Sequence, residues 1–433
     1  MRYSSTRFPL YCLLLMLAAS VVLSRPAAPA GGAAEKDGDV YRSLDILCDV
    51  ITIIQRDYIE KLGTERLMQD ALRGMLASLD SYSTYLPAPA PRATPGPPAG
   101  EPGTYGLEVA YKNRLLTVVS PVENGPAWKA GLKSGDLIIK IGEEPVDDRP
   151  LAELLQLFRG AAAGELRLQV ARRGEREFLD FTLAPGKVEG PAARTEMPED
   201  KIALLRIARF DRGTPARVAE CLAALKERGA DGTVLDLRDC PAGEIEAAIE
   251  VAGHFISEGG LVATLAARSD EARKEFVSSG AQPSAEGPVV ILVNGGTSGA
   301  AEVLAGALQA EGRGVLMGQK SFGCAFEEGT FTLKDGSVIT LLTAVYRTPA
   351  GAEIQDKGLT PDIEVVSETA ETEAGEGEGG EGEGEEFEIP DEKGEKGLKG
   401  VKAPKGEQET DPVVQRAIDL IKGMRIMKSK EGN

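Results

Sequence analysis

The chain has 433 residues, of which 42% are hydrophobic, enough for two to three domains with buried cores. Its formal net charge of -19 argues against nucleic-acid binding, which depends on clustered Lys and Arg. Twelve acidic residues and no basic one lie between Glu368 and Glu392, so the rest of the chain is only mildly acidic. With one His and no close pair of cysteines, neither a metal site nor a cofactor is expected.

Residues 1–31 predict a signal peptide or a membrane anchor. Arg2 and Arg7 precede an apolar run from Phe8 to Leu23, which is the order found in secretory signals. No clear small-residue cleavage site follows, and the run is short for a membrane span, so cleavage and anchoring both stay open. Either alternative predicts an extracytoplasmic protein, in a bacterial periplasm or anchored in an inner membrane. A wrongly assigned start codon is the third interpretation.

Residues 40–86 predict a helical region. Apolar residues recur at helical spacing between Tyr41 and Ile59, and again between Glu65 and Leu79. Two amphipathic helices of this length cannot bury their apolar faces alone, so they should dock on the body or on another subunit. The Pro-rich segment at 87–103 predicts an extended, solvated linker.

Residues 104–187 alternate short strand patterns with two helical ones. A short helix is expected at Ala127 to Leu132, a buried strand at Leu137 to Ile141, and a longer helix at Leu151 to Phe158. With the run SPVENGPAWKAGLKSGDLI, this segment resembles a PDZ domain. The resemblance implies an exposed strand edge that accepts an extended peptide, with the amides of Tyr105, Gly106, Leu107 and Glu108 holding its terminal carboxylate. A small β-rich scaffold without a ligand is the alternative.

Residues 195–366 alternate strands with helices. The strands IALLRI, TVLDL and VVILV are separated by helices expected at Pro215 to Arg228 and Glu244 to Phe255, and a further helix is expected at Ala300 to Ala310. This order predicts an α/β layer with a largely parallel sheet, whose active site would lie at the strand ends. Residues 367–410 are too rich in Glu, Gly and Lys to fold. A last helix at 411–433, with Asp411 as its N-cap, either docks on the body or only ends the chain.

Five motifs in matching order extend the resemblance over nearly the whole chain. They are LDSYSTYL, interpreted as helical, LDLRDCPAG, VNGGTSGAAEVLAGALQ, GQKSFG and YRTPAGAEIQDKGLTPDIEV. The chain resembles the carboxyl-terminal processing peptidases, the tail-specific serine peptidases of family S41. This implies an α/β core of the ClpP/crotonase-like type, with an inserted PDZ domain and N-terminal helices.

The family implies a serine nucleophile, a neutral lysine base and a glutamine that orients the lysine. Backbone amides hold the oxyanion, and they correspond here to Gly243 and Ala300. The serine position, three residues before Glu302, is Gly299; the lysine position after Phe-Gly is Cys324; the glutamine position is Glu328. Glycine has no oxygen with which to form an acyl intermediate, and Cys324 cannot replace the lysine base. No intact catalytic set is therefore predicted.

Two residues next to the expected positions could replace the missing serine and lysine. Ser298 is one residue off, and Lys320 precedes Phe-Gly instead of following it. A displacement of ~1 Å can already cost ~100-fold in rate, which disfavours this pair. The only histidine, His254, is expected to be structural, which leaves Ser/His and Cys/His triads without a base.

The resemblance also implies that Cys240 and Cys324 lie close to the catalytic positions that lack the serine and the lysine. A disulfide between them and two buried free thiols are the alternatives. The glycine-rich NGGTSG turn at a helix N-terminus predicts either a carboxylate-binding nest or an ordinary tight turn.

Three functions follow as hypotheses. The first is an inactive pseudopeptidase that binds extended or C-terminal peptide segments of exported proteins, as a homodimer or as a heterodimer with an active homologue. The second is a serine endopeptidase that cleaves exported proteins near their C-termini with Ser298 and Lys320. The third is a structural envelope protein without peptide affinity.

Overall fold

The computed structural model describes residues 33–88, 104–112, 115–146, 149, 151–160, 164–280, 283–285, 287–365 and 411–431. The predicted signal or anchor, most of the Pro-rich linker and the acidic segment lie outside the described residues. The chain divides into two units, Met1–Ala71 and Leu72–Asn433. Among the described residues, no helix combines the length and apolar character that a membrane crossing requires.

The first unit is helical, as the periodicity predicted. It contains α2 (Ala33–Asp57) and the first turns of α3 (Thr64–Ala77). The Gln55 side chain bridges the two helices by donating to Thr64 Oγ1 at 2.9 Å. Apolar side chains of α2 remain exposed, namely Val40, Tyr41, Leu44, Ile46, Val50 and Ile53.

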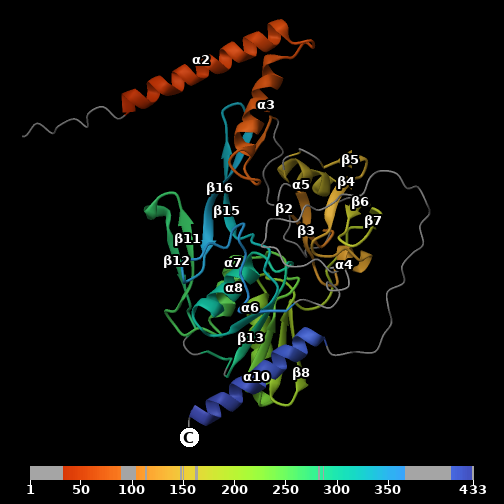
Figure 1. The fold of residues 1–433 in the computed structure, drawn as a ribbon, viewed down its shortest axis with the longest axis vertical. Helices are drawn as coiled ribbons and strands as arrows, with labels where there is room; N and C mark the ends of the chain where they lie inside the picture. The colour runs from red at the N-terminus through yellow and green to blue at the C-terminus, as the bar shows by residue number, and fades with distance from the viewer. Residues whose placement is uncertain are drawn as a thin grey trace, which may run out of the picture. The chain divides into compact units, whose positions relative to one another are not determined.

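Within the second unit, the PDZ-like segment forms one sheet and two helices (Figure 1). The strands are β2 (Leu107–Lys112), β3 (Leu115–Pro121), β4 (Leu137–Ile141), β5 (Glu144–Pro145), β6 (Leu166–Ala171) and β7 (Leu179–Leu183); the helices are α4 (Pro126–Ala130) and α5 (Leu151–Gly160). The order is β2-β3-β4-β6-β7, with β5 beside β4. Strand β2 is an edge strand of this sheet, since among the described strands it pairs only with β3.

The α/β layer is built on a largely parallel sheet, as predicted. The strands are β8 (Ala193–Glu199), β9 (Ile202–Ile207), β10 (Gly232–Asp236), β13 (Val289–Val293), β14 (Val315–Gly318) and β17 (Ile363–Glu364), in the order β17-β14-β13-β10-β9-β8. Only β8 runs antiparallel to its neighbour. The helices are α6 (Thr214–Glu227), α7 (Ile245–Ala252), α8 (Ala300–Ala310) and α10 (Pro412–Glu431).

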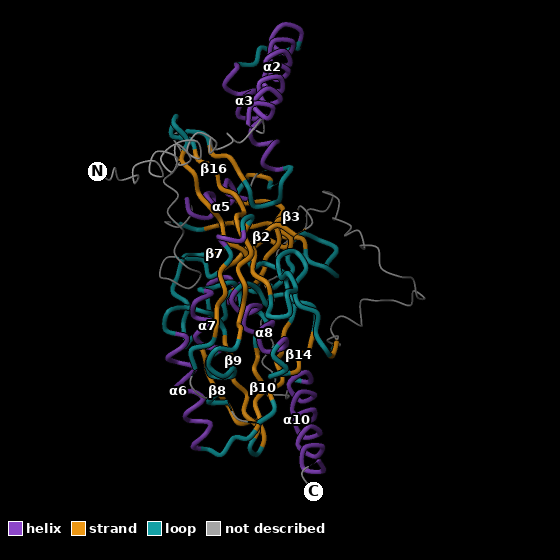
Figure 2. The backbone as a smooth tube through the Cα atoms, turned by 90° about the vertical axis from the view of Figure 1, so that its left-hand side faces the viewer, coloured by secondary structure: helices purple, strands orange, loops and turns teal. Residues whose placement is uncertain are grey.

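Both faces of this sheet are covered, which explains why every residue of VVILV is buried. Side chains alternate along β13: Val289, Ile291 and Val293 join the core that includes α6, α7 and α8, whereas Val290 and Leu292 join the core that includes α10. Figure 2 shows α6 and α7 on one side of the strands and α10 on the other. The last helix therefore docks on the body.

A second, antiparallel sheet was not anticipated from the sequence. It has the order β1-β16-β11-β12, with β15 beside β16, and is built from β1 (Thr84–Leu86), β11 (Leu261–Ala267), β12 (Lys274–Val277), β15 (Phe326–Thr332) and β16 (Val338–Arg347). A short 3-10 turn, η2 (Asp270–Ala272), precedes β12.

The helical interpretation of LDSYSTYL was wrong. Helix α3 ends at Ala77, and Thr84 pairs with Thr340 of β16. The Asp80 carboxylate accepts hydrogen bonds from the amides of Tyr82 and Ser83, which makes a turn where the helix would have continued. The β-branched and aromatic residues that follow suit a strand.

Candidate functional site

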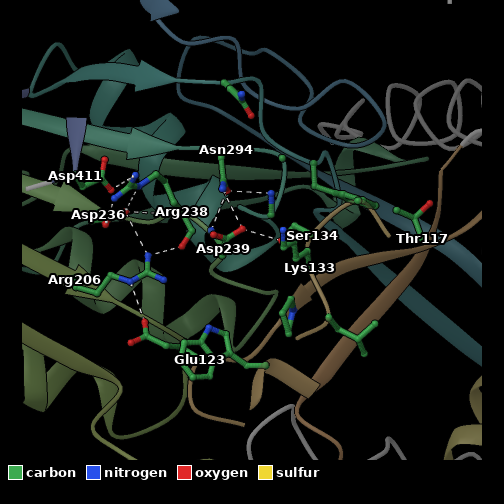
Figure 3. A pocket seen from close by; sticks show the side chains of 18 of the residues that line it. Thr117, Glu123, Lys133, Ser134, Arg206, Asp236, Arg238, Asp239, Asn294 and Asp411 are labelled. Atoms are coloured by element: carbon green, nitrogen blue, oxygen red, sulfur yellow. Dashed lines mark hydrogen bonds and ion pairs between the residues drawn. The ribbon is translucent and has the colours of Figure 1, made fainter. Parts of the chain in front are cut away.

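A cavity of about 830 Å³ lies between the PDZ-like segment and the ends of the parallel strands. The PDZ-like segment contributes Lys112, Trp128 and the loop at 133–135, and the α/β layer contributes the segments that follow β10 and β13 (Figure 3). Ligands of parallel α/β sheets bind at this edge, because the loops beyond the carboxyl ends of the strands meet there.

Ion pairs join the two walls of the cavity. Glu123 precedes α4, and its carboxylate contacts Arg194 of β8 at 2.6 Å and Arg206 of β9 at 3.2 Å. Arg206 is largely buried and also lies 3.3 Å from Asp236, at the end of β10. The arginine thus links the PDZ-like segment to the sheet.

The same chain of ion pairs reaches the C-terminal helix. Arg238 donates to both carboxylate oxygens of Asp236, at 2.9 and 2.8 Å, and lies 2.7 Å from the carboxylate of Asp411 at the start of α10. Although burial opposes it, the charges of Arg206 and Arg238 hold the pKa of Asp236 below its usual value. We refer to Arg194, Glu123, Arg206, Asp236, Arg238 and Asp411 as the ion-pair chain.

Asp239 fixes the loop after β10. Its carboxylate accepts hydrogen bonds from Ser134 Oγ at 2.8 Å and from the Asn294 side chain at 3.0 Å. Its amide donates to Asn294 Oδ1 at 2.9 Å, and its carbonyl accepts from Ser120 Oγ at 3.0 Å. Asp239 also has φ of 46°, which a non-glycine residue adopts at a cost. Ser120 and Ser134 belong to the PDZ-like segment, so both sides of the cavity hold this loop.

The backbone at the predicted nucleophile position has an unusual conformation. Gly299 has φ of 54° and ψ of -114° and directly precedes α8, which starts at the fully buried Ala300. Its amide donates to Glu302 Oε2 at 3.1 Å. The turn at the start of the helix is therefore intact, and no side-chain oxygen projects from it.

Glu302 connects that turn to the loop that carries the lysine position. Its buried carboxylate accepts hydrogen bonds from the amides of Gly323 at 2.8 Å and Cys324 at 2.9 Å, in addition to Gly299, and the hydroxyl of Ser321 donates to it. Burial raises the pKa of Glu302, and the hydrogen bonds oppose that shift. We call these five residues the Glu302 cluster.

Cys240 and Cys324 are free thiols, as is Cys221. Burial raises the pKa of Cys240 to about 12 and that of Cys324 well above its usual value, so both stay protonated at neutral pH. The hydroxyl of Tyr82 lies 4.0 Å from the sulfur of Cys324. A neutral thiol is neither a nucleophile nor a substitute for a lysine base.

Strand β2 of the PDZ-like segment lies against the degenerate catalytic positions. The carboxylate of Glu108 accepts a hydrogen bond from the amide of Ala242, and burial together with the nearby charge of Glu302 raises the pKa of Glu108 to about 7. Lys112 Nζ lies 4.7 Å from the centre of the Phe322 ring and 3.5 Å from the Phe322 carbonyl oxygen. The structure thus places Glu108, predicted as part of a peptide-binding loop, at the degenerate catalytic site.

The other residues of that predicted loop form a tight turn beside α4. Gly106 has φ of 60°, and its carbonyl accepts a hydrogen bond from the amide of Val122 at 2.8 Å. The carbonyl of Tyr105 accepts from Ala127 at 2.9 Å, and Leu107 begins β2. A Cβ atom at position 106 would also lie 3.2 Å from Pro126 Cδ, so glycine is favoured there.

The structure does not join the displaced pair. The hydroxyl of Ser298 is buried and has no hydrogen-bond partner among the described residues, whereas Lys320 is exposed. Glu328, at the glutamine position, is an exposed residue of β15. His254 lies just beyond α7, and its Nδ1 contacts Ser284 Oγ at 3.3 Å.

Of the predicted oxyanion residues, Ala300 adjoins Gly299, and Gly243 lies two residues before α7 with its Cα against the carbonyl of Phe210. Residues that the sequence analysis missed are Lys112, Asp239 and Gln355. Gln355 Oε1 accepts a hydrogen bond from the amide of Ala325 at 3.1 Å, beside Cys324. Its position within the motif AEIQDKG was the available signal. The described residues contain no cluster of His, Cys, Asp and Glu suited to a metal ion.

A two-walled site of this kind, with a PDZ domain facing the strand ends of an α/β core, defines a class of peptidase-like proteins. Residues 201–365 match the model of peptidase family S41, and residues 117–172 match that of the PDZ domain. The chain is 32% identical to the carboxy-terminal-processing protease of Bartonella bacilliformis, over 76% of each chain. It is 30% identical to the carboxy-terminal processing protease CtpA of Bacillus subtilis, over 72% of this chain and 66% of the relative.

The solved structure of the photosystem II D1 C-terminal processing protease is also similar. It matches with a TM-score of 0.60 and 26% identity, over 74% of this chain and 92% of that one. The chain belongs to the S41 family of carboxy-terminal processing proteases.

Proposed function

We propose that this protein is a pseudopeptidase that binds extended peptides with a free C-terminus and does not cleave them. The observation that carries the proposal is Gly299, because the turn before α8 is held in place while the atom that would attack a peptide bond is missing. Binding survives such a loss, since it uses backbone amides and shape and needs no nucleophile.

Neither remaining route to chemistry has the required partners. A serine nucleophile needs a base within hydrogen-bond reach, whereas the Ser298 hydroxyl has no hydrogen-bond partner among the described residues and Lys320 is exposed. A cysteine nucleophile needs a thiolate, and burial keeps Cys324 protonated.

Two features support a peptide carboxylate as the ligand group. Strand β2 is an edge strand, the kind of strand that an extended peptide can pair with, and the cavity that Lys112 of β2 helps to line has a volume of about 830 Å³. The amide of Ala242 already donates a hydrogen bond to a carboxylate of the chain itself, that of Glu108. A peptide C-terminus has the same chemistry and would compete for such donors.

The test uses the full-length protein and its only tryptophan, Trp128, which lines the cavity and reports occupancy through its fluorescence. An apolar decapeptide with a free carboxylate is titrated against the same decapeptide ending in an amide. The acid should bind about tenfold or more tightly, because the amide lacks the charge that strengthens hydrogen bonds to the donors. Equal affinities would refute the carboxylate preference.

Cleavage is measured in parallel with unfolded β-casein. No fragments should form over a day with the unmodified protein. Fragments that disappear in the Ser298→Ala variant would establish the displaced-residue peptidase in place of the pseudopeptidase.

We extend the proposal to location and assembly. The apolar N-terminal run supports an extracytoplasmic protein, cleaved or anchored, and the exposed apolar side chains of α2 support association with a second copy or with an active homologue. Fractionation of cells and light scattering of the purified chain test these two statements separately.

A further inference from the structure

Ala242 stands in the space that a side chain at position 299 would need. A Cβ atom built on Gly299 would lie 2.7 Å from Cβ and 3.0 Å from Cα of Ala242, and 3.4 Å from the carbonyl oxygen of Cys324. The first distance is shorter than Cβ atoms tolerate in real proteins. The obstacle belongs to the backbone and its first side-chain atom, so no rotamer change removes it.

The loop that carries Ala242 is held on both sides. The amide of Ser298 donates to the carbonyl of Cys240 at 3.1 Å, and the amide of Glu244 donates to the carbonyl of Phe210 at 3.1 Å. These bonds attach the residues before and after Ala242 to separate parts of the core. Withdrawal of Ala242 from Gly299 would break at least one of them.

Position 299 is held equally firmly. Its amide donates to Glu302, and the next residue, Ala300, is fully buried at the start of α8. Its φ of 54° adds a strain that any L side chain would meet there. Relief must therefore come from Ala242.

We infer that Ala242 closes the nucleophile site, in addition to the departures at Gly299, Cys324 and Glu328. Its methyl group fills the place from which a nucleophile at 299 would project, so a serine fits there only when residue 242 is glycine. The inference rests on the proposed function, and it predicts that restoring the side chains at positions 299, 324 and 328 alone does not reopen the site.

A melting cycle of full-length variants tests the packing. Gly299→Ser should lower the melting temperature by roughly 5 °C, and Ala242→Gly alone by about 2 °C. In the Ala242→Gly background, Gly299→Ser should cost less than about half of its original loss. The matched control is Gly295→Ser in the same loop, where a Cβ meets nothing within 4 Å; its effect should be the same in both backgrounds. An equal loss for Gly299→Ser in both backgrounds overturns the inference.

A second measurement tests access to the site. The triple variant Gly299→Ser, Cys324→Lys, Glu328→Gln is treated with a biotinylated fluorophosphonate, with and without Ala242→Gly. The serine oxygen attacks phosphorus, fluoride leaves, and the hydroxyl proton passes to the introduced lysine. The variant with Ala242→Gly should be labelled about tenfold faster or more.

Equal labelling of the two proteins, including no labelling of either, overturns the inference. The proposed function fails by a separate result, namely cleavage of β-casein by the unmodified protein.

Discussion

The Glu302 cluster and the catalytic positions share residues, yet the cluster has its hydrogen bonds in place whereas the catalytic positions lack the side chains that the family pattern implies. In the cluster, three backbone amides and one hydroxyl are directed at a buried carboxylate. At the catalytic positions the groups that would move a proton are missing, since Gly299 has no side chain and Cys324 holds a neutral thiol. The backbone of the site is therefore maintained by Glu302, without help from a nucleophile or a base.

Among the substitutions considered, Glu302→Ala should lower the free energy of unfolding the most. It leaves the buried amides of Gly299, Gly323 and Cys324 without an acceptor, at a cost of about 4 kcal/mol in the free energy of unfolding. Urea unfolding measures the change, and Glu302→Gln should give an intermediate value because it keeps one acceptor oxygen.

The exposed Glu328, one of the degenerate catalytic positions, is the control. Glu328→Ala should change the unfolding free energy by less than about 0.5 kcal/mol. Similar losses at positions 302 and 328 would show that the frame does not depend on Glu302.

Local elements and contacts between distant segments differ in how well the sequence predicts them. The parallel strands and α8 followed from apolar runs and helical spacing, because both signals are local. The resemblance located Gly299 and Cys324 by counting along the chain. Glu108 at the amide of Ala242 and Lys112 at Phe322 could not be foreseen, since they depend on how the PDZ-like segment meets the core. The strand at Thr84–Leu86 was missed because its partner, β16, lies over 250 residues away.

The pH dependence of the unfolding free energy tests the burial of Glu108. Its pKa is raised from 4.5 to about 7, so the folded protein binds the extra proton and loses stability as the pH rises through that interval. Glu108→Gln removes this titration. The variant should be more stable than the unmodified protein at pH 8, and the difference should shrink toward pH 5. Urea unfolding at both values measures it, and a difference that grows toward pH 5 would contradict the burial of this carboxyl group.

The smallest effect is expected where the PDZ-like segment holds the loop after β10. Ser134 donates one hydrogen bond to Asp239, and its loss in Ser134→Ala should cost about 1 kcal/mol. The exposed Ser257 serves as control, and Ser257→Ala should be neutral within about 0.5 kcal/mol.

The same substitution has a second readout, because Asp239 lies three residues before Ala242, and the amide of Ala242 donates a hydrogen bond to the Glu108 carboxylate. If the PDZ-like segment positions that amide, Ser134→Ala should weaken binding of the free-acid decapeptide more than binding of its amide form. A uniform loss for both peptides would show that the hydrogen bond stabilises the fold and leaves the carboxylate contact unchanged.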